Sequence, residues 1–248
     1  MQLRKLIPGV LLALTIGCTS GYRIAKSNRA EYAIDKDIPV DSNILHLYQP
    51  YKTKLEAEMN QVIGHSELLM AKVDTIPESV LGNFFADATL QQGRKLDPEI
   101  DFAMPSTKGG IRTAVPKGEI RVSNVFELMP FENALMVYTI SGAEAQQLLN
   151  FIAASNGQPV SGIRMKIRDR KPEEVVINGK AFDINSNYKV LTSDYIASGG
   201  DNARGFKNPV AVKELGLKVR DALLNHIKEQ EAAGKKINSS LDGRITKD

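Results

Sequence analysis

The chain has 248 residues, of which 25% are charged and 42% hydrophobic, proportions that are typical of a globular protein. Its formal net charge of +3 is close to neutral for this length, which argues against nucleic acid as a partner. Because the chain has a single cysteine, an internal disulfide is excluded.

The first residues predict a bacterial secretory signal of the lipoprotein type. Arg4 and Lys5 provide a charged start, and the apolar run over 6–16 is too short to span a bilayer as a helix. The letters TIGC then place a small residue before Cys18. We therefore expect removal of a signal peptide over 1–17 and lipidation of Cys18; in the alternative, the signal is cleaved elsewhere and this cysteine is incidental. The expected location is the bacterial cell envelope, lipid-anchored and facing the periplasm or the cell surface.

The segment over 18–50 is polar, carries several charges and has few large hydrophobic clusters. Such a composition predicts a tether, here leading from the membrane to a folded domain over 51–248. We find neither an internal repeat nor a low-complexity tract.

The first strong helical pattern covers 78–96. Glu78 and Ser79 follow a proline and occupy capping positions. The apolar residues of this segment share one helical face, namely Leu81, Phe84, Phe85, Ala88 and Leu90.

Extended and helical patterns alternate through the middle of the chain. A short buried strand is expected over 101–107 and a longer strand over 134–141. Ser141 is a typical N-cap, which predicts a helix over 141–155.

The last third of the domain begins with a predicted β-hairpin. The segments 162–169 and 173–182 alternate in hydrophobicity, and Asn178 and Gly179 are the expected turn. We expect one further strand over 188–198.

A long amphipathic helix is expected over 211–234, where apolar residues recur at four-residue spacing. These residues are Leu215, Val219, Leu223 and Ile227. The mixture of strand pairs and helices predicts an α+β fold with mixed β-sheets layered with helices.

Catalytic motifs are missing from the sequence. His46, His65 and His226 are far apart and show no metal-ligand spacing, so we interpret each as a surface or strand residue. No nucleophile elbow, Walker loop or dinucleotide fingerprint is present either. The sequence therefore offers binding features and no catalytic ones, and we expect no cofactor in this chain.

Four segments in order resemble the C-terminal, substrate-binding domain of the 5'-nucleotidase family: LGNFFADATL, KGGIR, PFENALMVYTISGAEAQQLL and YKVLTSDYIASGGDNARGF. The resemblance runs from about position 54 to the DGRI near the C-terminus, which is nearly all of the expected domain. It implies the fold of that domain and a site for a nucleotide or nucleoside.

The resemblance implies a role for four side chains. Phe131 and Tyr195 would hold the nucleobase between their rings, because every base has a π face on which an aromatic ring can stack. Asn133 would contact the base edge, and Asp201 would accept hydrogen bonds from the ribose hydroxyls. From the residues alone, Phe131 would be a core ring after a proline and Tyr195 an ordinary strand tyrosine.

The glycine-rich segments complete the implied site. Gly199 and Gly200 would clear space for the ligand, although from the residues alone they could equally belong to an ordinary turn that an aspartate caps. In the GGIR segment, with Gly109 and Gly110, the guanidinium of Arg112 would reach the phosphate or a neighbouring group.

Two departures from the family pattern lie next to the GGIR segment, where Thr107 and Lys108 replace an asparagine and a glycine. The lysine would either restore a positive charge near the phosphate or block the pocket. Gly162 is a weaker match to a glycine whose backbone lies near the base.

Family members normally carry an N-terminal two-metal phosphoesterase domain, whose motifs this chain does not contain. The resemblance therefore implies the nucleotide-binding half of a 5'-nucleotidase-type phosphohydrolase, inactive alone and paired with a separate metallophosphoesterase chain that holds the divalent metal ions. The alternative is a stand-alone nucleotide- or nucleoside-binding surface lipoprotein without a hydrolase role.

Overall fold

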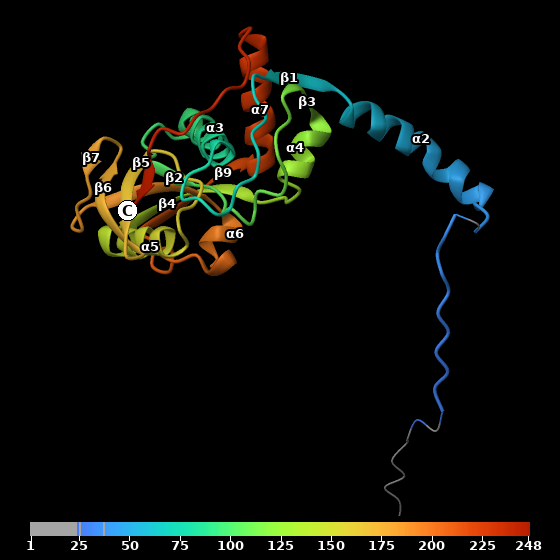
Figure 1. Cartoon of the computed structure of the whole chain (residues 1–248), viewed down its shortest axis with the longest axis horizontal. Coiled ribbons are helices and arrows are strands. Elements are labelled where there is room, and N and C mark those ends of the chain that lie inside the picture. Colours follow the sequence, from blue (N-terminus) through green and yellow to red (C-terminus); the bar gives the residue numbers. More distant parts are fainter. Residues whose placement is uncertain (1–23, 25, 37) are drawn as a thin grey trace, which may run out of the picture. The chain divides into compact units, whose positions relative to one another are not determined.

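The computed structural model describes residues 24, 26–36 and 38–248 (Figure 1). The predicted signal peptide and Cys18 lie outside the described residues. The chain separates into two units, which meet between Tyr48 and Gln49. Within the described part, no helix combines the length and the apolar character that crossing a membrane requires.

Helix α2 (Ser42–Met59) was not predicted, and it runs across position 50, where we expected the tether to end. None of its side chains is buried. Leu47 and Tyr51, for example, are 72% and 75% exposed. The helix therefore owes its conformation to its own backbone hydrogen bonds, and an apolar pattern that is not buried gives a weak helical signal.

Serine caps begin two helices of the folded unit at the predicted positions. The Ser79 side chain accepts a hydrogen bond from the backbone N–H three residues later at the start of α3 (Val80–Leu96). Ser141 does the same for α5 (Gly142–Ala154). The predicted apolar face of α3 is confirmed, because all five of its residues are buried: Leu81, Phe84, Phe85, Ala88 and Leu90.

The central sheet has four strands in the order β2-β8-β4-β9. The middle strand β8 (Asn187–Ser193) runs parallel to β2 (Phe102–Met104) and antiparallel to β4 (Ala134–Ser141). Leu135 lies opposite Ser193 in the register of β4 and β8. The start of β4 and the end of β8 therefore lie at the same end of the sheet.

The side chains of the central sheet alternate between two hydrophobic cores, as strand geometry requires. Leu135 of β4 and Leu191 of β8 face the core that α3 helps to form. Ile140 and Val190 face the core of α5. Figure 1 shows α3 and α5 on opposite sides of β4. The sheet is thus buried on both faces, and its two ends remain for loops.

The smaller sheets complete an α+β architecture. One has four strands, in the order β10-β5-β6-β7, with β10 parallel to β5, and the other is an antiparallel pair. The mixed sheets layered with helices confirm the predicted fold class. The bounds are β1 Val62–Ser66, β3 Gly118–Arg121, β5 Ile163–Arg168, β6 Lys171–Ile177, β7 Lys180–Ala181 and β10 Ile245–Lys247.

The predicted hairpin over 162–182 exists, but its turn was assigned wrongly. Asp169 and Arg170 join β5 to β6, and both have positive φ angles, of 49° and 61°. Asn178 and Gly179 instead turn the chain from β6 into the short strand β7. Both pairs adopt the left-handed backbone of a two-residue hairpin loop, and the sequence signal of Asn-Gly was simply the stronger one.

The strand predicted over 188–198 is too long. Strand β8 ends at Ser193, whose side chain accepts a hydrogen bond from the Ile196 N–H at 3.3 Å. This cap begins the short helix α6 (Asp194–Ala197), which the 3₁₀ turn η2 (Gly200–Asn202) follows. A serine cap after a strand outweighs the extended pattern of the residues behind it.

The helix predicted over 211–234 is wrong in its first third. Residues Ala211–Lys218 form strand β9, which pairs with β4 at the edge of the central sheet. Only Val219–Ala232 form helix α7, preceded by Gly216 at a φ of 64°. Leu215 therefore belongs to the strand, because pairing with β4 satisfies backbone groups that a helical pattern alone cannot account for.

His226 is not the surface or strand residue that we expected. It lies on α7, partly buried, with its ring edge-on to Phe84 at 6.0 Å between centroids. Its Nδ1 is buried and has no hydrogen-bond partner within the described residues. Burial lowers the pKa of His226, with opposing effects from Glu229 and Lys95.

We expect the stability of the domain to fall as the pH drops below about 6.5, the ordinary histidine value. The pKa of His226 is lower in the folded protein, so between the two values the unfolded chain holds a proton that the native chain does not. Acidification therefore favours unfolding until the folded pKa is passed. Urea midpoints of wild type and His226→Phe between pH 5 and 8 measure this dependence. Asp87, Glu229 and Lys95 surround the ring, and an undiminished dependence in the variant would assign the effect to them.

Candidate functional site

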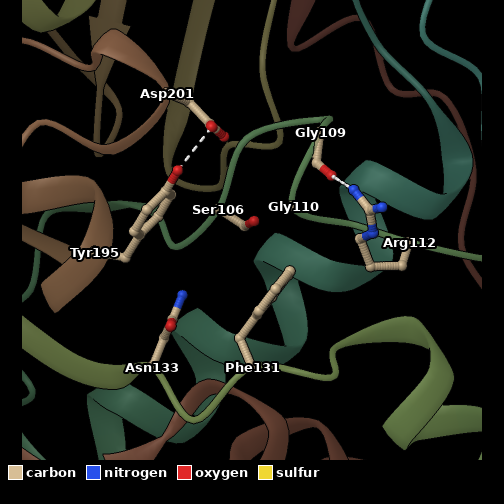
Figure 2. Close-up of a pocket in the computed structure, with 8 residues that line it drawn as sticks. All are labelled: Ser106, Gly109, Gly110, Arg112, Phe131, Asn133, Tyr195 and Asp201. Atoms are coloured by element: carbon tan, nitrogen blue, oxygen red, sulfur yellow. Dashed lines mark hydrogen bonds between the residues drawn. The ribbon is translucent and has the colours of Figure 1, made fainter. Parts of the chain in front are cut away.

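Three loops meet at the end of the central sheet where β4 begins and β8 ends (Figure 2). They enclose a cavity of about 310 Å³. Seven of the residues that the sequence singled out lie around it: Gly109, Gly110, Arg112, Phe131, Asn133, Tyr195 and Asp201. The eighth lining residue, Ser106, was not predicted.

Tyr195 reaches the cavity because β8 gives way to a helix immediately before it. The ring lies on the first turn of α6 and is 45% exposed. A Cβ on Gly200 would lie 2.5 Å from the tyrosine ring. Gly199 has a φ of 91°, which favours glycine. Neither glycine lines the cavity; together they let the chain turn back behind the ring.

Asp201 is fixed by two side chains. It accepts a hydrogen bond from the Tyr195 hydroxyl at 2.9 Å (Figure 2), and its other carboxylate oxygen accepts one from the Thr107 hydroxyl. The hydrogen bond to the carboxylate raises the pKa of Tyr195. Thr107 is 97% buried, as its relative exposure of 3% shows. The departure from the family pattern at position 107 therefore supplies a donor that orients the aspartate.

Phe131 and Asn133 precede β4 on one loop and approach the cavity from the side shown at the bottom of Figure 2. The phenylalanine ring is 41% exposed, which is unusual for so large an apolar side chain unless it contacts a ligand or partner. The backbone carbonyl of Asn133 accepts a hydrogen bond from the Val219 N–H at 2.9 Å. This bond ties the loop to the first residue of α7 and leaves the Asn133 amide group to the cavity.

The GGIR loop forms the remaining wall. Arg112 is exposed and donates one hydrogen bond to the Gly109 carbonyl at 3.0 Å (Figure 2). A Cβ on Gly110 would lie 2.1 Å from the Ser106 hydroxyl oxygen, so only glycine fits there. The guanidinium keeps further donors for an anion, because Gly109 uses only one of its five N–H groups.

Lys108 neither adds charge to the cavity nor blocks it. Its Nζ donates to the backbone carbonyls of Ile76 at 2.5 Å and Asn156 at 2.8 Å, and its own backbone N–H donates to the Gln158 side chain. Burial lowers its pKa. Lys108 therefore joins three segments behind the GGIR loop and fixes that loop in place.

Replacing Lys108 with Met is expected to destabilise the domain by about 1–3 kcal/mol, because two carbonyls lose a charged donor. The preference for AMP over adenosine should not change, since the ammonium group does not face the cavity. Urea unfolding and calorimetry with both ligands measure the two quantities. Arg112→Ala is the matched comparison, and an equal loss of AMP preference in both variants would contradict this role of Lys108.

Gly162 does not join the site. Its φ is 81°, and a Cβ there would lie 2.6 Å from the Asp101 carbonyl oxygen. It belongs to a different hollow, next to Arg244. Its glycine is thus explained by a close backbone approach, and the weak match to the family's base-contacting glycine is not supported by its position.

The described residues contain no group of three or more His, Cys, Asp or Glu side chains that could hold a metal ion. His46 is exposed on α2, and His65 on β1 lies 3.0 Å from the Glu231 carboxylate, so these two are the surface and strand residues that we expected. The chemistry available at the cavity is therefore recognition. Two half-exposed rings suit a flat aromatic group, a fixed carboxylate suits hydroxyl donors, and a guanidinium suits an anion.

Comparison with known proteins gives a family and several relatives. A family model described as "5'-nucleotidase, C-terminal domain" matches residues 62–208. The cell wall protein Lmo0130 of Listeria monocytogenes is 27% identical over 234 residues, which cover 84% of this chain and 30% of that protein. The 5'-nucleotidase of Vibrio cholerae is 28% identical over 176 residues, covering 66% of this chain and 30% of that protein.

The crystal structure of a 5'-nucleotidase precursor from Thermus thermophilus superimposes with a TM-score of 0.69 at 27% identity. The match covers 84% of this chain and 44% of that chain. The chain thus spans less than half of this structure and less than a third of the Listeria and Vibrio proteins. The resemblance that the sequence motifs predicted is confirmed at the level of the family.

Proposed function

Because this chain belongs to the 5'-nucleotidase C-terminal domain family, we propose that it binds a nucleotide or nucleoside and serves as the binding half of a phosphohydrolase. The observation that carries the proposal is the meeting of Phe131 and Tyr195 at one cavity, 41% and 45% exposed. Buried core rings are the ordinary outcome for such residues, and the structure keeps both rings accessible.

In the proposed complex the base lies between the two rings. Asn133 contacts the base edge, and Asp201 accepts hydrogen bonds from the ribose hydroxyls while Tyr195 and Thr107 hold its carboxylate. The phosphate lies toward Arg112. The cavity of about 310 Å³ lies at the lower end of the usual size range of small-molecule sites.

The hydrolytic step is proposed to take place on metal ions that a separate metallophosphoesterase chain holds. The described part of this chain has no metal-ligating cluster, whereas positioning an ester is a contribution that a binding domain can make alone. The proposed docking surface lies around Arg112 and Asp201, on the GGIR and GGD loops, where the phosphate would leave the cavity.

Titration calorimetry of the purified full chain against nucleosides, nucleotides and nucleotide sugars tests the binding proposal. Binding at micromolar to millimolar concentration that requires Asp201 supports it, because the aspartate is expected to hold the ribose. No binding of any of these ligands at millimolar concentration would reject it. Binding without any effect on a phosphoesterase partner would favour a stand-alone nucleotide-binding surface lipoprotein.

We further propose that the protein is anchored through an acylated Cys18 in the cell envelope, in keeping with the charged start and the TIGC letters of its sequence. Cys18→Ser is expected to move the protein from the membrane fraction to the soluble fraction and to abolish palmitate labelling. Full membrane attachment of the variant would contradict the anchor.

A further inference from the structure

Glu132 lies between the two cavity residues of its loop, yet its side chain points to other partners. Its carboxylate accepts hydrogen bonds from Lys218 and Arg220, at the end of β9 and the start of α7. These bonds lower the pKa of Glu132 to about 2, the bond from Lys218 having the larger effect. The carboxylate is therefore ionised at any pH at which the domain would be used.

Arg220 needs this carboxylate. Its side chain is only 7% exposed, and its guanidinium lies 4.1 Å from the centre of the Phe126 ring on helix α4 (Val122–Leu128). Its Nε is buried and has no hydrogen-bond partner within the described residues. A buried charge is costly unless it is paired, so Glu132 is the group that makes the position of Arg220 tolerable.

The backbone repeats the connection. The Val219 N–H donates to the Asn133 carbonyl at 2.9 Å, and Ala134 pairs with Lys218 at the end of the β4–β9 ladder. The loop of Phe131 is thus attached to one corner of the structure by two side-chain bonds and one backbone bond. The phenylalanine ring, in contrast, is 41% exposed.

We propose that Glu132 is a positioning residue, which through Lys218 and Arg220 holds the loop of Phe131 in the conformation that receives the base. The inference rests on the proposed function, since it assigns the source of base affinity at the same site. Glu132 touches no ligand in this scheme. Its effect passes through the ring of Phe131, and this property separates it from a merely structural ion pair.

The test compares Glu132→Ala with wild type by calorimetry against adenosine, guanosine, cytidine and uridine. Affinity for the nucleosides that bind is expected to fall about tenfold, the equilibrium equivalent of ordering the backbone of roughly one residue on binding. Hydrogen exchange of the ligand-free protein over 129–134 is expected to become faster. Glu132→Gln keeps an acceptor without the charge and should lose less; it carries the test if the alanine variant does not fold.

A double-mutant cycle makes the assignment specific. In a Phe131→Ala background, Glu132→Ala should change nucleoside affinity little, because the ring through which it acts is gone. The matched control is Glu229→Ala, which removes a carboxylate on the same helix α7 that accepts hydrogen bonds from Gln92 and Lys95. This control should leave nucleoside affinity unchanged.

Three results would overturn the positioning role while leaving the proposed function standing: unchanged affinity in Glu132→Ala, an equal loss in Glu229→Ala, or an equal loss in the Phe131→Ala background. The absence of binding of all four nucleosides to wild type would overturn both. The two failures are therefore distinguishable, because only the second is visible in the wild-type protein.

Discussion

The purified chain, supplied with Mn²⁺ or Mg²⁺, is expected to release no phosphate from AMP. The described residues offer no cluster that could hold two metal ions, and phosphate-ester hydrolysis of this kind depends on such ions. Addition of a metallophosphoesterase chain from the same bacterium should produce hydrolysis at least about 100-fold faster than either chain alone, because positioning the ester against the metals is what the binding half adds. Released phosphate, followed colorimetrically, is the measurement.

The Asp201→Ala variant of the chain is the control in this experiment, since it should fold and yet fail to stimulate the partner. Metal-dependent hydrolysis that copurifies with the single chain and disappears on mutation within it would contradict the division of labour. Equal activity of the partner with and without the chain would instead favour the stand-alone binding lipoprotein.

Alanine at either ring is expected to weaken nucleoside binding by about 1–3 kcal/mol, the usual effect of removing an aromatic group that stacks on a base. Phe131→Ala and Tyr195→Ala should act alike on adenosine and AMP, because neither ring is placed near the phosphate. Arg112→Ala should mainly weaken AMP, since the guanidinium pairs with the anion. Calorimetry with both ligands separates the two effects.

Conservative variants sharpen this comparison. Phe131→Tyr keeps a stacking ring and should bind nearly as well as wild type. Tyr195→Phe also keeps the ring but removes the hydrogen bond to Asp201, so any loss reports on the ribose contact. Full affinity in both alanine variants would mean that the rings do not stack on the base.

The sequence predicted the members of the cavity well because they flank recognisable strands. Phe131 and Asn133 precede β4, and Tyr195 follows β8, so that placing those two strands side by side also places the loops together. The strand β9 was misread because its apolar residues also fit a helical spacing, and only its partner β4 decides between the two. Such a choice depends on a neighbour more than 70 residues away in the chain, and the local pattern does not contain it.

The contacts behind the site could not be predicted for the same reason. Lys108 finds its acceptors 32 and 48 residues away, on loops with no regular pattern. Thr107 meets Asp201 across 94 residues. A family motif names residues that touch a ligand, whereas the groups that hold those residues change with each sequence.

The register of β4 and β8, with Leu135 opposite Ser193, divides the labour between scaffold and recognition. The ladder sets the separation of the two ring-bearing loops, and every ligand-facing side chain lies just outside it. Mutations at 131, 133 and 195 can therefore accumulate without breaking a single interstrand hydrogen bond. A library randomised at these three positions should consist mostly of folded proteins, so that this domain can acquire a new ligand preference by steps that never pass through an unfolded intermediate sequence.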